Sequence, residues 1–195
     1  LDENCDSEAN DATGEVPEEL KAELRDMGAY GLQVPEEYGG LGLNNTAYAR
    51  AVEVIGARDL GLGIHLGAHQ SIGYKGILLF GTPEQKEKYL PRLASGETVA
   101  AFSLTEPGAG SDAASVQARA TRAADGAGWE ITGQKIWSSN GPIADLFTVF
   151  ARTEVPDPKN PGETKDKMSA FIVERGFGGV ETGPKEHKLG IRCSP

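Results

Sequence analysis

A glycine-rich turn that follows an apolar segment is the part of this sequence with a residue pattern suited to binding a ligand. The stretch FSLTEPGAGSD covers residues 102–112 and contains Gly108 and Gly110. Glycine adopts positive φ without steric cost, so successive backbone N–H groups could face an anion, with the hydroxyls of Thr105 and Ser111 beside them. The turn could therefore hold a pyrophosphate. An ordinary β-turn is the alternative, because no helix follows it as a dinucleotide-binding fold requires.

A second candidate is the stretch WSSNG at residues 137–141, which places Trp137 beside the hydroxyls of Ser138 and Ser139. An indole and two hydroxyls could stack on and hydrogen-bond a planar heterocycle. The alternative is a tryptophan that covers the core at the end of a strand. The pattern alone favours that alternative.

Two histidines and two carboxylates have less specific patterns. His65 and His69 are four residues apart, but the string HLGAH lacks the glutamate of H-E-x-x-H and has no third ligand nearby. Core or channel-lining histidines are therefore favoured over a metal site. Glu106 and Asp112 flank the glycine turn and could act as a pair in acid–base chemistry, but solvated turn carboxylates are the safer interpretation.

These motifs depend on helices in the first half of the chain. Apolar spacing predicts amphipathic helices over residues 18–27 and 45–55, and the apolar stretch at 60–80 predicts a buried helix. The string T-P-E-Q at Thr82 is a capping box that opens another helix, and Pro91 is expected to kink or stop it.

The second half of the chain predicts strands. Alternation at residues 118–121 indicates a half-buried antiparallel strand, and Asp125-Gly126 is a hairpin signal. Helices followed by strands indicate an α+β fold. We expect a flexible acidic head at 1–14, a helical domain at 15–97 and a truncated β domain at 98–195. The predicted strands are TVAAFSLT, SVQARATRA, WEITGQKIWSS, LFTVFART and MSAFIVERG.

Composition excludes several classes of protein. The 195 residues carry a net charge of −10, of which residues 1–28 contribute −8, so the rest shows no basic face for nucleic acid. No apolar run approaches the ~20 residues of a membrane span. Cys5 and Cys193 are too few for a disulfide scaffold, and they fit a reducing compartment. The chain starts with leucine, so any targeting peptide is expected to be removed or never included.

The two motifs together resemble the acyl-CoA dehydrogenase family. FSLTEPGAGSD is followed by WSSNG some 25 residues later, and both are preceded by an apolar helix and by GTPEQKEKYLPRLASGE. Within the family, the stretches DLGLGIHLGAHQSIGYKGILLFGT and MSAFIVERGFGGVETGP are most similar to members that act on very long chains. The resemblance implies an N-terminal helical domain and an antiparallel, barrel-like middle β domain that is incomplete in this chain.

The resemblance also implies a flavin site. Thr105 would reach the flavin ring system, Ser139 would lie near its N5 atom, and Ser111 would lie where FAD meets the CoA part of the substrate. The residues expected to bind FAD are Phe102, Ser103, Leu104, Thr105, Glu106, Pro107, Gly108, Ala109, Gly110, Ser111, Trp137, Ser138 and Ser139.

The implied reaction is the oxidation of long or very long-chain fatty acyl-CoA to trans-2-enoyl-CoA in mitochondrial β-oxidation. The implied partners are the acyl-CoA substrate, electron-transferring flavoprotein and a second copy of the chain. The family's catalytic glutamate lies in a C-terminal helical domain, which could also contact the inner membrane. No catalytic residue is therefore assigned here. The chain is expected to be a fragment, which in isolation would retain flavin weakly or not at all.

Two departures from the family motif W-I-T/S-N-G-G are Ser138 in place of isoleucine and Pro142 in place of the second glycine. Proline removes an N–H and fixes φ, so the geometry at the flavin edge is the part these departures affect. Pro195 also differs from the family and is expected to mark an incomplete end. A noncatalytic assembly factor and an oxidase that passes electrons to oxygen remain alternatives to the dehydrogenase.

Overall fold

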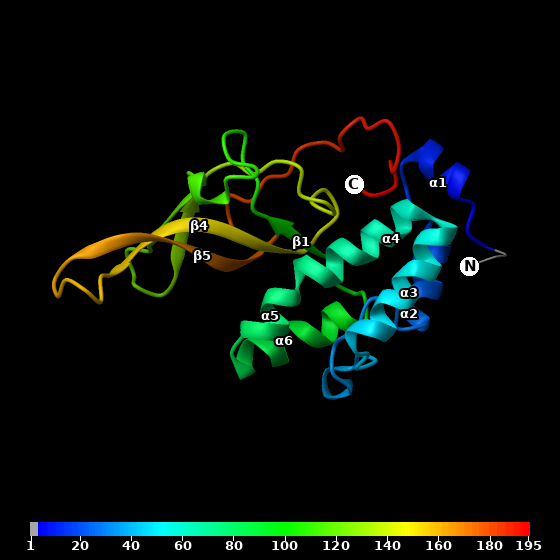
Figure 1. Cartoon of the computed structure of the whole chain (residues 1–195), viewed down its shortest axis with the longest axis horizontal. Coiled ribbons are helices and arrows are strands. Elements are labelled where there is room, and N and C mark those ends of the chain that lie inside the picture. The colour runs from blue at the N-terminus through cyan, green and yellow to red at the C-terminus, as the bar shows by residue number, and fades with distance from the viewer. Residues whose placement is uncertain (1–3) are drawn as a thin grey trace.

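The computed structural model describes residues 4–195, so the first three residues of the predicted head lie outside it. The described chain is helical up to Ala94 and forms strands from Ala100 onward (Figure 1), which confirms the predicted α+β order. The helical elements are α1 (Ser7–Thr13), α2 (Glu18–Asp26), η1 (Glu36–Tyr38), α3 (Asn45–Arg58), α4 (Leu60–Gly67), η2 (Ala68–Gly73), α5 (Lys75–Phe80), α6 (Pro83–Ala94) and, between strands, η3 (Ala113–Ser115).

The expectation of an irregular head is wrong for residues 7–13, which form α1. The Asp6 side chain caps the helix by accepting a hydrogen bond from the Ala9 N–H, and Gly14 ends it with φ of 71°. Asn10 is buried and donates a hydrogen bond to Asp59 at 2.8 Å. The cap and this long-range contact offset the entropy of ordering a polar segment.

The capping box predicted at Thr82 is present at the start of α6, where the Thr82 and Gln85 side chains each bond the other's backbone N–H. Pro91 was expected to kink or stop the helix, and the stop is wrong, because the helix continues to Ala94. Leu90 and Leu93 on either side of the proline are fully buried. Their packing holds the last turn in place against the loss of one helical hydrogen bond.

The single helix predicted over 60–80 is helical but divided into α4, the π-helical segment η2 and α5. The glycines of α4 allow the close approach that their small size predicts. A Cβ on Gly63 would lie 3.1 Å from the Cα of Gly56, so α3 and α4 cross nearly backbone to backbone. π-Helical turns tend to occur at functional sites, and η2 leads directly toward the sheet.

Five strands form one mixed sheet, whose order is β1-β4-β2-β3 with β5 on β4. The β2–β3 hairpin predicted at Asp125-Gly126 is confirmed. An entirely antiparallel sheet was expected, but β1 and β4 run parallel, because the long connection between them returns the chain in the same direction. The strands are β1 (Ala100–Ser103), β2 (Arg119–Arg122), β3 (Trp129–Thr132), β4 (Leu146–Pro156) and β5 (Thr164–Glu174).

The β4–β5 hairpin extends away from the helices (Figure 1), whereas β1 packs against η2. His69 of η2 accepts a hydrogen bond from the Ala100 N–H at 3.0 Å, and Thr148 of β4 donates to the Gly73 carbonyl at 2.6 Å. These bonds fix the start of β1, and with it the motif at residues 102–112, relative to the helices. Of the helices in residues 4–195, none has the length and apolar character needed to cross a bilayer.

Candidate functional site

The two predicted motifs lie side by side. The Ile136 N–H donates to the Thr105 carbonyl at 2.9 Å, and the hydroxyls of Ser103 and Ser138 are 3.0 Å apart. The segment that follows β1 is thus hydrogen-bonded to the segment that carries Trp137. The structure brings together two stretches that are more than 25 residues apart in the sequence.

Glu106 has a different role from the one the sequence suggested. It was expected to be a solvated turn carboxylate, but its side chain is 6% exposed and pairs with Lys135 at 2.7 Å. It also accepts hydrogen bonds from the Gln117 and Ala118 N–H groups. Burial alone would raise the pKa of Glu106, but the ammonium and the two N–H groups outweigh it and hold the pKa below its ordinary value.

The Lys135 side chain connects the motif at residues 102–112 with the segment that carries Trp137. Lys135 also donates to the Leu104 carbonyl at 3.1 Å, so one ammonium contacts both ends of the Leu104–Glu106 bend. Because its carboxylate is engaged by three partners, Glu106 supports the turn and is not free to act as a base. The partner was missed because it lies 29 residues away in the sequence.

The glycine turn does not have the predicted backbone. Neither Gly108 nor Gly110 is in the positive-φ region, and the N–H groups of Glu106 and Ala109 bond each other's carbonyl oxygens. However, a Cβ at Gly108 or Gly110 would meet nothing within 4 Å. The protein itself does not need glycine at these two positions, so close approach by a ligand remains a reason for it.

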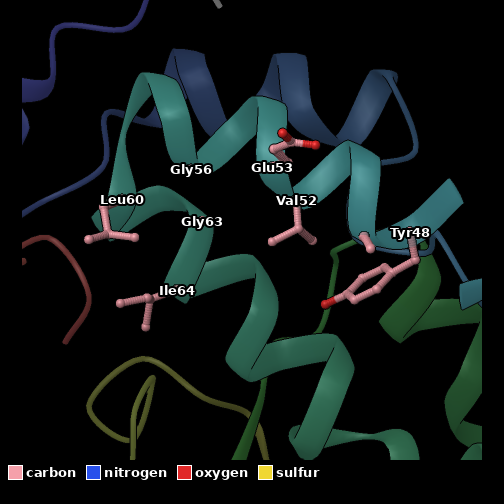
Figure 2. A pocket seen from close by; sticks show the side chains of 8 residues that line it. Tyr48, Val52, Glu53, Gly56, Leu60, Gly63 and Ile64 are labelled. Carbon is pink, nitrogen blue, oxygen red and sulfur yellow. The ribbon is translucent and has the colours of Figure 1, made fainter. Parts of the chain in front are cut away.

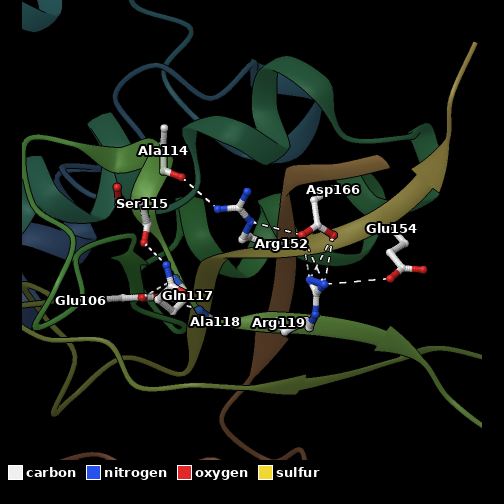
Figure 3. Close-up of polar contacts among 9 residues, drawn as sticks. All are labelled: Glu106, Ala114, Ser115, Gln117, Ala118, Arg119, Arg152, Glu154 and Asp166. Carbon is white, nitrogen blue, oxygen red and sulfur yellow. Dashed lines mark hydrogen bonds and ion pairs between the residues drawn. The ribbon is translucent and has the colours of Figure 1, made fainter. Parts of the chain in front are cut away.

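The segment that directly follows the glycine turn is hydrogen-bonded to the β4–β5 hairpin (Figure 3). Arg152 of β4 donates to the Ala114 carbonyl at 3.1 Å and lies 3.6 Å from Asp166 of β5. Arg119 of β2 forms a bidentate pair with the same Asp166, with N–O distances of 3.0–3.2 Å. This network holds the end of the turn against the β4–β5 hairpin, whereas the ion pair of Glu106 with Lys135 holds its beginning.

Trp137 does not cover the core. Its side chain is 72% exposed, and its backbone is left-handed with φ of 56°. Asn140, three residues later, is also left-handed with φ of 65°, and its side chain is fully buried. A left-handed conformation is unusual for a bulky residue and costs free energy, whereas asparagine adopts it readily. An exposed indole in a strained turn suits a residue that contacts a ligand.

The thirteen predicted cofactor residues fall into three groups by exposure. The side chains of Ser103, Glu106 and Ala109 are buried and face the protein. The exposed members are Pro107, Gly108, Gly110, Ser111 and Trp137, and the half-buried ones are Phe102, Leu104, Thr105, Ser138 and Ser139. Within the described part of the chain, the hydroxyls of Thr105, Ser111 and Ser139 have no protein partner, which leaves them available to a ligand.

The predicted assignment of His65 and His69 to the core is confirmed, since both are almost fully buried. Burial lowers the pKa of His65 to about 4 and that of His69 to about 3, and their hydrogen bonds offset only part of the effect. Both rings are therefore neutral at physiological pH.

A groove of about 570 Å³ lies between α3 and α4 (Figure 2). Sequence reasoning missed it, because only the crossing of the two helices creates it. The lining is almost entirely apolar; the residues are Tyr48, Ala49, Val52, Glu53, Gly56, Leu60, Gly63 and Ile64. A groove of this size and character is suited to a flexible hydrocarbon chain.

Known protein families and known proteins match this chain over almost its whole length. The model of the acyl-CoA dehydrogenase N-terminal domain matches residues 2–97, and that of the middle domain matches residues 101–195. The human mitochondrial very long-chain specific acyl-CoA dehydrogenase is 59% identical over 194 residues, which is 100% of this chain. The chain spans 30% of the length of that relative.

Solved structures match in the same way. An acyl-CoA dehydrogenase from Bacillus anthracis, complexed with FAD, superposes with a TM-score of 0.80 at 43% identity, covering 90% of this chain and 28% of the other. The butyryl-CoA dehydrogenase of Megasphaera elsdenii gives a TM-score of 0.81 at 38% identity, covering 95% of this chain and 47% of the other.

Proposed function

Because the chain belongs to the acyl-CoA dehydrogenase family, we propose that it forms part of an FAD-dependent enzyme that oxidises long or very long-chain fatty acyl-CoA to trans-2-enoyl-CoA. The proposal is carried by one observation. The Ile136 N–H donates a hydrogen bond to the Thr105 carbonyl, which places the motif at residues 102–112 next to the exposed Trp137. This pairing puts free hydroxyls and an aromatic surface in one place.

The residues fit the flavin nucleotide. Gly108 and Gly110 leave open space where a side chain would stand, which gives a pyrophosphate room to approach the backbone. Trp137 would bind one edge of the isoalloxazine ring, with the hydroxyls of Thr105 and Ser139 hydrogen-bonding its polar atoms. When bound, FAD supplies the hydride acceptor that the dehydrogenation requires.

The contribution of the chain itself is binding and orientation. Hydroxyl donors fixed before the reaction stabilise developing negative charge without reorganising. The reaction also needs a carboxylate base to remove the proton α to the thioester. Glu106 is engaged in an ion pair, so we assign no base in this chain. We place the base in the C-terminal helical domain that the family resemblance implies.

The glycine turn gives a direct test of flavin binding. Replacing Gly108 or Gly110 by alanine should weaken FAD binding by about tenfold, the effect of one lost close contact, with little change in stability. The measurement is a fluorescence titration of the apoprotein encoded by the complete reading frame with FAD. Gly128→Ala is the matched control, since its Cβ also meets nothing within 4 Å but it lies in the β2–β3 hairpin. An equal loss in the control would contradict the assignment.

Activity is tested by adding palmitoyl-CoA to the FAD-loaded complete protein without oxygen. Loss of the flavin's visible absorption supports the dehydrogenase. Bound FAD that is not bleached would instead indicate a noncatalytic assembly factor, and peroxide release in air would indicate an oxidase.

We propose that the groove between α3 and α4 receives the hydrocarbon chain of the substrate. Burial of apolar surface stabilises such a chain by about 25 cal/mol per Å². Gly56→Leu should raise KM for palmitoyl-CoA by about tenfold and leave butyryl-CoA nearly unaffected, because only the longer chain would reach the filled groove. Gly76→Leu in α5 is the control, since both glycines are helical and a Cβ at either would meet nothing within 4 Å. Equal effects on both substrates would exclude this groove.

The remaining assignments extend from the family. We propose that residues 15–97 and 98–195 correspond to its helical and middle β domains, and that the complete protein is a mitochondrial homodimer. Its electron acceptor would be electron-transferring flavoprotein. The mitochondrial relative at 59% identity supports the location, and association with the matrix side of the inner membrane is part of the same proposal.

A further inference from the structure

A chain of buried hydrogen bonds connects the helices to the turn that carries Trp137. The Tyr30 hydroxyl lies 3.0 Å from His65 Nε2, and His65 Nδ1 lies 2.9 Å from Asn140 Oδ1. All three side chains are at most 1% exposed. Asn140 also donates from Nδ2 to the His65 carbonyl at 2.9 Å.

The bonds determine the protonation of His65. Because Asn140 Nδ2 points to the His65 carbonyl, its Oδ1 faces the ring and can only accept, so His65 Nδ1 carries the proton. His65 Nε2 is then unprotonated and accepts from the Tyr30 hydroxyl. The ring is neutral in this arrangement, in keeping with its burial.

This series of hydrogen bonds ends at the turn that contains Trp137 and Asn140. Trp137 and Asn140 are both left-handed, and such a conformation persists only where the surroundings determine it. The Asn140 carbonyl accepts hydrogen bonds from the N–H groups of Ile143 and Ala144, and its side chain holds α4. His65 thus links α4 directly to the turn, and the Asn140 N–H also donates to the Pro195 carbonyl at 2.6 Å.

We propose that His65 is a positioning residue, which holds the turn of Trp137 and Asn140 in its left-handed conformation through the Nδ1–H bond to Asn140. Its use in orienting the flavin rests on the proposed function. The conformation of the turn does not, and it can be measured without FAD.

Two conservative substitutions separate the two hydrogen bonds of the His65 ring, one to Asn140 and one to Tyr30. His65→Asn places an amide N–H near the position of Nδ1 and can still donate to Asn140. His65→Gln places its amide near Nε2 and can still contact Tyr30, but loses Asn140. A purely structural role of the buried ring predicts that the two variants behave alike.

The measurement is ¹⁹F NMR of the complete protein labelled with 5-fluorotryptophan. The resonance that disappears in Trp137→Phe reports Trp137. We expect it to keep its position in His65→Asn and to shift or split in His65→Gln. Equal shifts in both variants, or no shift in either, would overturn the proposal.

Asn140→Gly covers the case in which His65→Gln does not fold. Glycine permits positive φ without strain, so the variant can still fold with this turn, but the side-chain bonds to His65 that hold the turn in place are lost. The Trp137 resonance should shift in this variant, and an unchanged resonance would overturn the proposal.

A separate FAD titration should give about tenfold weaker binding for His65→Gln than for His65→Asn, the effect of one buried hydrogen bond. If the unsubstituted protein does not bind FAD, the proposed function fails while the NMR result still decides the role of His65. If it binds FAD but the two variants bind equally well, His65 does not orient the flavin.

Discussion

Replacing Lys135 by methionine is expected to lower the free energy of unfolding by about 3 kcal/mol. The Lys135 ammonium lies 2.7 Å from Glu106, and the two side chains are 12% and 6% exposed. After the substitution the carboxylate would lose its counter-charge while remaining out of water. Urea denaturation followed by circular dichroism measures the change.

A double-mutant cycle tests whether the cost comes from the pair itself. Glu106→Gln keeps an acceptor oxygen for a backbone N–H but has no charge to pair with Lys135. The double variant should be more stable than the sum of the two single losses predicts, by about 1–3 kcal/mol. Strictly additive losses would mean that the two side chains are not coupled.

The exposed pair of Arg92 and Glu97 is the matched control. Its N–O distance is 3.0 Å, but the side chains are 62% and 63% exposed. Arg92→Met should therefore change stability by no more than about 0.5 kcal/mol, because water solvates whichever charge remains. A loss as large as that of Lys135→Met would show that burial is not the cause.

Elements with local causes were predictable from the sequence. The capping box at Thr82 depends on residues three apart, and the alternation before Arg122 depends on neighbours within one strand. Both are present, since each signal acts over a few residues and needs no knowledge of the rest of the fold. The recognition of paired motifs likewise used only their order and spacing.

Features with distant causes were not predictable in this way. Glu106 is buried because β1 and the segment of Lys135 are brought side by side, which no local pattern specifies. Helix α1 forms in a polar head because Asn10 reaches Asp59, 49 residues away. Pro91 is accommodated because Leu90 and Leu93 are buried by other elements. In each case tertiary contacts outweigh the local preference.

The site combines these two kinds of cause. The residues that remain available to a ligand, such as Trp137 and the glycines of the turn, were visible in the sequence as candidates. The residues that hold them, Glu106 with Lys135 and His65 with Asn140, acquire their roles only through contacts across 29 and 75 residues. Ligand-binding residues can therefore be found from a motif, whereas the residues that position them require the fold.

Lowering the pH is expected to cause the second large loss in the free energy of unfolding. His65 and His69 have native pKa values of about 4 and 3, whereas a histidine in the unfolded chain titrates near 6.5. Below about pH 6.5 the unfolded chain binds protons that the native state excludes. Stability is therefore fully present above that pH and is lost as the pH falls toward the native values.

The expected slope is about 1.4 kcal/mol per pH unit for each histidine, or nearly 3 kcal/mol per unit for both. A fall from pH 6.5 to 5 would then remove about 3–4 kcal/mol, a large part of the 5–15 kcal/mol typical of a domain. Carboxylates with lowered pKa values, such as Glu106, lose their contribution only below the ordinary value of 4.5. Urea denaturation at several pH values between 6.5 and 5 therefore isolates the histidines.

His69→Gln provides the internal comparison. Glutamine can still donate a hydrogen bond toward the Leu93 carbonyl, which His69 Nε2 contacts at 3.0 Å, but it does not titrate. The slope between pH 6.5 and 5 should fall by half in this variant, to about 1.4 kcal/mol per unit, because one of the two excluded protons is removed. An unchanged slope in His69→Gln would mean that the native state does not exclude the proton of His69. A stability independent of pH in the unsubstituted protein would mean that both rings are hydrated and protonated in the native state.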